Sequence, residues 1–375
     1  GWAVDDIGHV NFVHSLSMQF GFMQQAGAGW VRINFRLGKC FADWTSSSDI
    51  CAGADALTAL GIYDEVVDKA HASNLRVLGL LTNESMRGDQ TEWLANNSER
   101  LGGNGDNAYA RRFARDVAGV LARHFADRVN AWEVWNEPNA WTENPSPGVF
   151  AGGSFMYPSN YAWLLKRSYA AIKTEQPNTS STVISGGLFG HDGDGAPGSA
   201  GIKGASLVNG RNITCASSAS SGADYLCLTY AAGVSSAGWV AGAYPLDRVG
   251  QHLYVDQGAS TSVDNIKRYV DDVRHAYVQY EGVNTGKQTE ITEIGWFANP
   301  SSADFATTQA RAAENMRIAY STFSAIPYIS RAYWFNIQDV PEANLFAGQV
   351  DGGDDYSLGT PKYPVFSMFQ RWART

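Results

Sequence analysis

Two short segments carry carboxylates in settings typical of catalytic chemistry. The first is Trp-Asn-Glu-Pro-Asn at residues 135–139, and the second is Thr-Glu-Ile-Gly-Trp at residues 292–296. Each follows an apolar run, and Pro138 stops the first run because proline has no backbone N–H to continue a strand. The pattern predicts two strands that present Glu137 and Glu293 at their C-terminal ends.

Two carboxyl groups that face each other across a cavity match the chemistry of glycosidic bond hydrolysis. One must be protonated to help the leaving oxygen depart, and the other must be ionised to attack the anomeric carbon. Asn136, beside the first glutamate, is placed to hydrogen-bond a sugar hydroxyl near the reacting carbon. Such bonds strengthen as positive charge develops in the transition state.

Two further glutamates lie in the same runs and compete for these roles. Glu133 sits in the middle of its strand and would need an arginine partner if it points inward. Strict alternation puts Glu290 on the face opposite Glu293. We therefore interpret both as structural.

Short apolar runs alternate with longer amphipathic stretches along the chain, which predicts βαβ units and a parallel sheet. The predicted strands are Trp30–Phe35, Leu75–Leu81, Val129–Trp135, Thr182–Gly186, Arg248–Tyr254, Thr289–Ile294 and Ala332–Asn336. The predicted helices are Tyr63–Ala72, Ala108–Phe125, Asn160–Glu175, Val263–Tyr280 and Thr307–Phe323. A short eighth strand near Trp2–Asp6 would close a (β/α)8 TIM barrel, in which active sites lie at the C-terminal ends of the strands. An open doubly wound sheet is the alternative, but no Gly-x-Gly-x-x-Gly turn supports a dinucleotide-binding version.

No Pro/Ser-rich linker divides the chain, so residues 1–375 are predicted to form one catalytic domain. The Gly/Ser-rich stretch at about 186–245 is interpreted as a long loop insert with a short helix of its own. A second long loop is expected over Leu345–Pro361.

Charge and hydropathy exclude several kinds of partner. The net charge is −9, which opposes a nucleic-acid partner. Neutral sugars are favoured over uronic acids for the same reason. No apolar run reaches the roughly 18 residues of a membrane span. The chain holds 12 Trp, and Trp44, Trp141 and Trp296 fall on presumed loops at the catalytic face, as sugar subsites or as packing residues.

The 4 cysteines form two close pairs in the sequence. Three pairings are possible, and the local one, Cys40–Cys51 with Cys215–Cys227, is predicted. Disulfides suit an oxidising compartment, so we expect a secreted protein, in keeping with a chain that begins at Gly1 rather than Met. Neither a Cys-x-x-Cys nor a His-x-His motif is present, so no metal and no cofactor are predicted.

The two glutamate segments resemble those of glycoside hydrolase clan A, a group of retaining enzymes with both glutamates on strands four and seven of a barrel. The match runs from about residue 20 to the C-terminus and is closest to family 39. The resemblance implies Glu137 as acid/base and Glu293 as nucleophile. It also implies Arg32 beside the nucleophile, where its charge would keep that carboxylate ionised.

Further positions match the clan on its sixth and eighth strands. His252 and Tyr254 form a His-x-Tyr, with the tyrosine implied to contact the nucleophile and the histidine the substrate. Trp334 matches a platform tryptophan.

Three functions follow as hypotheses. The main one is a secreted, monomeric retaining glycoside hydrolase acting on an oligo- or polysaccharide, by exo or endo action. The alternatives are a metal-dependent TIM-barrel hydrolase and a carbohydrate-binding barrel without activity. Loss of activity with a chelator would favour the former, and binding without cleavage the latter.

Overall fold

The computed structural model describes most of the chain. The described residues are 12–37, 56–86, 93, 106–139, 156–177, 181–191, 204–208, 211–215, 221–296, 304–335, 350–352, 358–361 and 364–373. The predicted strand near Trp2–Asp6, the predicted Cys40–Cys51 pair, Trp44 and Trp141 lie outside them.

Parallel strands form the centre of the molecule. They are β1 (Trp30–Asn34), β2 (Arg76–Leu81), β3 (Ala131–Val134), β4 (Thr182–Ser185), β5 (Leu188–His191), β8 (Arg248–Tyr254), β9 (Gln288–Ile294) and β10 (Ile329–Trp334). Their order in the sheet is β1-β2-β3-β4-β8-β9-β10, with β5 also paired to β8. Every neighbouring pair is parallel and in chain order, as βαβ units require. All seven predicted strands are confirmed.

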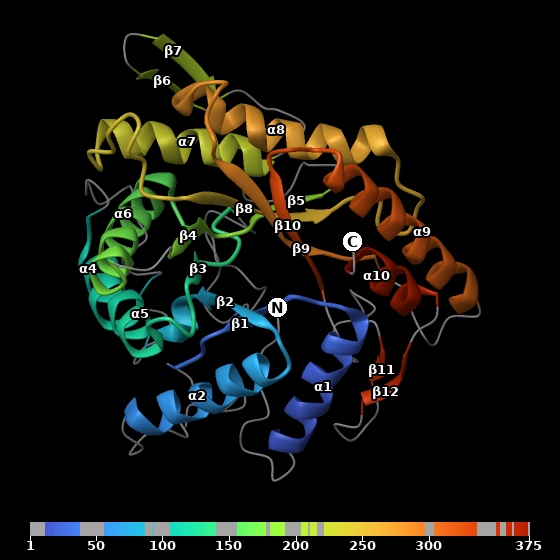
Figure 1. Ribbon diagram of the computed structural model, residues 1–375. Coiled ribbons are helices and arrows are strands. Elements are labelled where there is room, and N and C mark those ends of the chain that lie inside the picture. The colour runs from blue at the N-terminus through green and yellow to red at the C-terminus, as the bar shows by residue number, and fades with distance from the viewer. Residues whose placement is uncertain are drawn as a thin grey trace.

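Helices surround the sheet as an outer ring (Figure 1). They are α1 (Phe12–Ala26), α2 (Ala56–Ala72), α4 (Ala108–Phe113), the π-helical turn η3 (Ala114–Gly119), α5 (Val120–Phe125), α6 (Pro158–Glu175), α7 (Ser221–Ser235), α8 (Val263–Glu281), α9 (Phe305–Ser324) and α10 (Val365–Ala373), with a 3-10 turn η1 (Asn83–Ser85) after β2. The five predicted helices are confirmed, since α4, η3 and α5 form one continuous rod. Each described helix is too short or too polar to cross a lipid bilayer.

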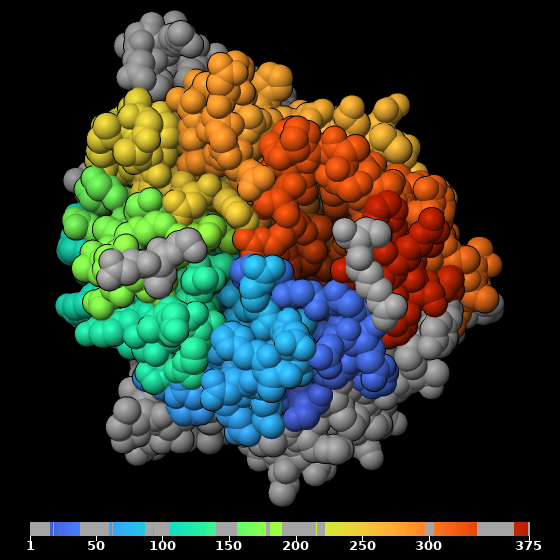
Figure 2. Space-filling view, in the orientation of Figure 1, coloured from blue at the N-terminus to red at the C-terminus, as the bar shows by residue number. Residues whose placement is uncertain are grey.

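The sheet curls until its first and last strands come close to each other, so the (β/α)8 barrel is confirmed and the open sheet is not. Figure 2 shows the N-terminal and C-terminal helices side by side, and Gln370 Nε2 of α10 donates to Gln25 O of α1 at 2.9 Å. Between β1 and β10 a cavity of about 240 Å³ is lined by both strands, including Trp30 and Arg331. The barrel is therefore nearly closed, with this seam as its opening.

Local sequence explains why the ring helices form where they do. In α8, Ser262 caps the N-terminus by accepting a hydrogen bond from Asn265 N at 3.1 Å. Its buried residues recur every three or four positions and face the sheet: Ile266, Tyr269, Val270, Val273, Ala276, Tyr277 and Tyr280. Helix α6 begins with Pro158 in its first turn, where the missing N–H costs nothing.

The stretch at 186–245 was expected to be a long loop insert with a short helix of its own, and the structure contains more than that. It contains β5, which continues the barrel wall, and α7, which packs between α6 and α8 in the ring. It also holds the antiparallel hairpin of β6 (Gly204–Val208) and β7 (Arg211–Cys215), and the Cys215–Cys227 disulfide ties β7 to α7. The high content of glycine and serine did not indicate strand β5 or the full length of helix α7. In the second predicted loop, β11 (Val350–Gly352) pairs with β12 (Leu358–Pro361).

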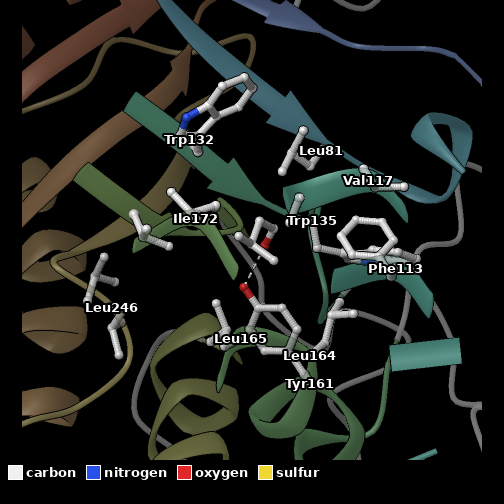
Figure 3. Close-up of a cluster of buried hydrophobic side chains, with 14 of the residues drawn as sticks. Leu81, Phe113, Val117, Trp132, Trp135, Tyr161, Leu164, Leu165, Ile172 and Leu246 are labelled. Atoms are coloured by element: carbon white, nitrogen blue, oxygen red, sulfur yellow. Dashed lines mark hydrogen bonds between the residues drawn. The ribbon is translucent and has the colours of Figure 1, made fainter. Parts of the chain in front are cut away.

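The apolar core lies mainly between the sheet and the ring. In Figure 3, Trp132 and Trp135 pack there with side chains of α6, and Tyr161 OH donates to Val134 O at 2.9 Å. The same hydroxyl accepts from Gly186 N at 2.6 Å, so it joins the ends of β3 and β4. Inside the barrel the apolar layer is small: Leu78, Ala131, Ile184 and Tyr333, with Trp30 against them. Charged side chains also lie in the interior, where Glu290 pairs with Arg248 and Arg331 and Glu133 pairs with Arg32.

Candidate active site

A strained turn at the end of β3 delivers Glu137. Trp135 and Glu137 have φ values of 77° and 45°, a region that costs a side-chain-bearing residue roughly 1–3 kcal/mol. Asn139 holds the turn by donating to Phe189 O at 2.7 Å and accepting from Phe189 N at 2.8 Å. The Trp135 ring is fully buried and packs edge-on against Trp93. The strain persists because these contacts fix both sides of the turn.

An irregularity in β9 delivers Glu293. The β8–β9 register pairs Gln251 with Ile291 and then His252 with Glu293, so one residue of β9 is skipped. Thr292 and Glu290 keep the inward alternation, and the skipped position turns Glu293 toward the same interior. The expectation that Glu290 and Glu293 occupy opposite faces is therefore wrong, because strict alternation fails at this shift.

The two glutamates lie close together at the C-terminal end of the barrel. Glu137 is 9% exposed and Glu293 is 8% exposed. One carboxylate oxygen of each glutamate and one ring nitrogen of His252 lie within 4.8 Å of one another. Retaining glycosidases hold their carboxyl groups about 5–5.5 Å apart, whereas inverting enzymes need about 6.5–9.5 Å. The observed proximity fits the shorter spacing.

Arg32 of β1 donates hydrogen bonds to three side chains of the site. Its Nη1 donates to Glu293 Oε1 at 2.5 Å, its Nε to Glu133 Oε2 at 2.5 Å and its Nη2 to Asn136 Oδ1 at 2.9 Å. Burial by itself lowers the pKa of Arg32, but the charges of Glu133 and Glu293 raise it above its ordinary value. Arg32 thus lies beside Glu293, the position that the sequence predicted for it.

Tyr254 of β8 contacts the other oxygen of the same carboxylate. Its hydroxyl donates to Glu293 Oε2 at 2.5 Å. Burial and then the charge of Glu293 raise the pKa of Tyr254 well above its ordinary value, so the phenol keeps its proton. For Glu293, burial opposes ionisation, but the charge of Arg32 and the hydrogen bond from Tyr254 outweigh it, and the pKa falls well below its usual range. Glu293 is ionised at neutral pH.

His252 lies against Glu137. Its Nδ1 is 2.6 Å from Glu137 Oε1, and its Nε2 is 3.4 Å from Arg32 Nη2. Because an arginine can only donate, this network assigns the hydrogen to Nδ1, which donates to Glu137. The ring is 0% exposed and contacts the carboxylate, and the expected contact of His252 with substrate stays a prediction.

Asn136 lies next to Glu137 in the turn after β3. It is half-buried, its Oδ1 accepts from Arg32, and no described residue bonds its Nδ2. The amide group is oriented by the guanidinium with one donor left for a ligand. This agrees with the expectation that Asn136 bonds a sugar hydroxyl, which stays a prediction.

The two described tryptophans among the candidate sugar-binding residues differ. Trp334, at the end of β10, is half-buried and packs against Trp296 at 6.1 Å between ring centroids. Trp296 is 2% exposed and its Nε1 donates to Val255 O at 2.7 Å. For Trp296 the packing interpretation therefore holds, because its ring and its N–H are both used inside the protein. It supports Trp334 from behind.

Glu137, His252 and Glu293 form a group whose ligand atoms are close enough to hold a metal ion. The donor set of two carboxylates and one imidazole suits zinc. However, Arg32 already pairs with Glu293, and Nδ1 of His252 carries a hydrogen that a metal would have to displace. The group fits a carboxylate pair better than a metal centre.

Three residues of the site were not predicted: Glu133, Thr292 and Gly187. The Glu133 carboxylate accepts from Gly187 N at 2.8 Å, from Thr292 Oγ1 at 3.0 Å and from Arg32. A Cβ on Gly187 would lie 2.1 Å from the His252 ring, so only glycine fits there. The sequence did indicate that Glu133 would need an arginine partner if it pointed inward. Arg32 is that partner.

Comparison with known proteins identifies the fold. No protein-family model matches the chain, and no curated protein matches it in sequence. Among solved structures, a family 1 β-glucosidase from Thermotoga maritima is similar with a TM-score of 0.58 and 13% identity, covering 95% of this chain and 86% of that one. A broad-specificity family 5 endoglucanase from Clostridium longisporum gives 0.57 and 12%, covering 96% and 85%.

A family 39 glycoside hydrolase from Bacteroides cellulosilyticus is also similar. Its TM-score is 0.50 at 16% identity, and the match covers 96% of this chain and 60% of that one. At such identities the likeness concerns the fold. The resemblance to clan A that the two glutamate segments indicated is thus matched by a barrel shared with glycoside hydrolases of families 1, 5 and 39.

Proposed function

We propose that the protein is a retaining glycoside hydrolase that cleaves an oligo- or polysaccharide by double displacement. The observation that carries the proposal is the pair of buried carboxyl groups of Glu137 and Glu293, with an oxygen of each within 4.8 Å. A shared barrel alone does not imply an activity, because one fold serves many reactions. The proposal rests on the pair and on the different surroundings of its two members.

In the first step Glu293 attacks the anomeric carbon and Glu137 protonates the leaving oxygen. Arg32 and Tyr254 keep Glu293 ionised. Because Glu137 Oε1 accepts from His252, the transferable proton belongs on its Oε2. The product of this step is a glycosyl ester of Glu293.

In the second step Glu137, now ionised, takes a proton from water, and that water attacks the anomeric carbon of the ester. Glu293 leaves as a carboxylate, stabilised again by Arg32 and Tyr254. Asn136 supports both steps by holding a sugar hydroxyl beside the reacting carbon. Inversion occurs twice, so the anomeric configuration is retained.

The sugar-binding surface is proposed to include Trp334, and Trp44 and Trp141 beyond the described residues. The acidic net charge of −9 favours a neutral sugar. We further propose that residues 1–375 act as one secreted, monomeric catalytic domain that needs no cofactor. The Cys215–Cys227 disulfide is compatible with an oxidising compartment.

The test is a substrate screen with stereochemical analysis. The protein is incubated with 4-nitrophenyl glycosides and with plant and microbial polysaccharides, and the first product is followed by proton NMR. We expect cleavage of at least one substrate and initial formation of the product with the configuration of the substrate. Initial formation of the opposite anomer would show inversion and end the double-displacement mechanism.

Two controls separate the alternatives. Incubation with EDTA should leave the activity unchanged, because the proposed steps use only protein groups. A fall in activity that zinc restores would instead favour metal-dependent hydrolysis at Glu137, His252 and Glu293. Oligosaccharide binding measured by calorimetry, without release of reducing ends over days, would support a binding protein.

A further inference from the structure

Glu133 has surroundings that a merely buried carboxylate does not require. It is 0% exposed and lies on β3, four residues before Glu137. Three donors converge on it from three other parts of the barrel: Arg32 on β1, Gly187 after β4 and Thr292 on β9. Burying an ionised carboxylate is costly unless such donors satisfy it. Here the donor set also fixes where the carboxylate lies.

Glu133 contacts Nε of Arg32, and the position of this nitrogen determines the directions of Nη1 and Nη2. A guanidinium is planar, so anchoring Nε on one side sets the directions of Nη1 and Nη2. With Nε on Glu133, Nη1 lies 2.5 Å from Glu293 and Nη2 lies 2.9 Å from Asn136. Without the hydrogen bond from Nε to Glu133, the guanidinium could rotate and form a bidentate salt bridge with Glu293 alone.

We propose that Glu133 is a positioning residue that aims Arg32 at the nucleophile and at Asn136 together. The inference rests on the proposed function, since it assigns Glu293 and Asn136 the roles given above. Glu133 is fully buried, so we place it behind Arg32 and outside direct contact with a sugar. It acts on the reaction through Arg32.

The charge of Glu133 has a second consequence. Arg32 shares one positive charge between two carboxylates, so Glu293 is held ionised without being bound as tightly as in a lone ion pair. Without the charge of Glu133, Arg32 would bind Glu293 more strongly and weaken it as a nucleophile. Formation of the glycosyl ester should then slow, while departure of Glu293 in the second step should not.

The experiment compares Glu133→Gln with Glu290→Gln. Glu290 is the matched control, because it is also 0% exposed, lies inside the same barrel and pairs with two arginines. Activity is measured on whichever 4-nitrophenyl glycoside the wild-type chain cleaves fastest, among the β-D-glucoside, β-D-xyloside, β-D-galactoside and β-D-mannoside. Melting temperature and inhibition by the free monosaccharide product are measured alongside.

We expect Glu133→Gln to lower kcat/KM about 100-fold, as misplacement of a reacting group does. The inhibition constant of the monosaccharide should change less than about threefold, because binding of the product does not depend on the orientation of the Arg32 guanidinium. Glu290→Gln should keep kcat/KM within about threefold of the wild type. Equal losses in both variants, in proportion to their melting temperatures, would show a structural role and overturn the proposal.

Thr292→Val provides a second variant that keeps every charge. It removes one donor to Glu133 while its shape is unchanged, so the fold should survive even if Glu133→Gln does not. We expect kcat to fall about fivefold with KM unchanged, the signature of a lost transition-state interaction. If kcat stays at the wild-type value in Thr292→Val and Glu293→Ala is inactive, Glu133 does not position Arg32, and the proposed function stands. If the wild type cleaves none of the substrates, the proposed function itself fails.

Discussion

Strand β9 carries two buried glutamates three positions apart, and they make different use of arginine. Glu290 pairs with Arg331 Nη2 at 3.0 Å and with Arg248 Nη1, deep inside the barrel. Glu293 pairs with Arg32 at 2.5 Å at the C-terminal end of the same strand. Both are carboxylates in ion pairs that the barrel interior encloses.

The difference between them lies in their other neighbours. Burial raises the pKa of Glu290 in spite of its two arginines, whereas the pKa of Glu293 falls below its usual range. Glu290 has Tyr333 OH at 3.5 Å and no access to solvent, while Glu293 faces Glu137 and keeps 8% of its surface exposed. A buried ion pair by itself therefore does not mark a catalytic carboxylate. A second carboxylate close by, as Glu137 is to Glu293, is the feature expected of a catalytic pair.

The largest expected effect comes from removing the proposed nucleophile. Glu293→Ala should lower kcat on aryl glycosides by about 10⁴-fold or more, because no other group can form the glycosyl ester. Added azide should enter the space left by the side chain, restore part of the activity and give a glycosyl azide of inverted configuration. Product analysis by NMR checks this. If Glu293→Ala kept normal turnover, Glu293 would be a structural carboxylate like Glu290 and not the nucleophile.

Removing the acid should have a smaller effect that depends on the substrate. Glu137→Ala should slow cleavage of substrates with poor leaving groups by about 10²–10⁴-fold, the usual contribution of general acid catalysis. A 2,4-dinitrophenyl glycoside needs no protonation, so its ester formation should proceed at near the wild-type rate. The ratio of kcat/KM for the two kinds of leaving group is the measurement. An unchanged ratio would assign the proton to another residue.

Weakening one contact to Glu293 should shift its ionisation. Tyr254→Phe removes the donor to Oε2, so the carboxylate loses stabilisation and the pKa of Glu293 rises toward its ordinary value. Activity requires ionised Glu293, so the acidic limb of the kcat/KM profile should move to higher pH. At neutral pH we expect a decrease of about tenfold. A limb that moves to lower pH would contradict the assigned direction of the hydrogen bond.

The smallest effect on activity is expected at the Glu290 cluster. Arg248→Met removes one partner of Glu290 and leaves Arg331, so stability should fall by about 1–3 kcal/mol. Activity per folded molecule should remain within about twofold, because no contact of the proposed site changes. Urea unfolding gives the first quantity and aryl glycoside turnover the second. A large loss of turnover would mean that the two clusters are coupled.

Much of the fold could be predicted from local pattern. Buried parallel strands such as Leu75–Leu81 are apolar runs, and helices such as α8 have apolar residues every three or four positions, so both follow from neighbours in the chain. Prediction failed at 186–245, where glycine and serine suggested a loop. Helix α7 and strand β5 form there because α6, α8 and β8 pack against them, and such contacts lie far away in sequence.

The site divides in the same way. The places of Glu137 and Glu293 at strand ends indicated that these two would meet, and the resemblance to clan A added Arg32 and Tyr254 beside the nucleophile. The skipped residue in β9 and the buried location of Trp296 could not be predicted, because they depend on how β8 and β10 lie against β9.

By itself the sequence determined seven of the barrel strands and that two of them end in glutamates, because hydrophobic period and proline act within a few residues. Only the tertiary structure decided that Glu290 and Glu293 both face the barrel interior, and that Glu133 holds Arg32 beside Glu293. The reason is that strand register and the sharing of one guanidinium among several acceptors arise only when distant strands are brought together.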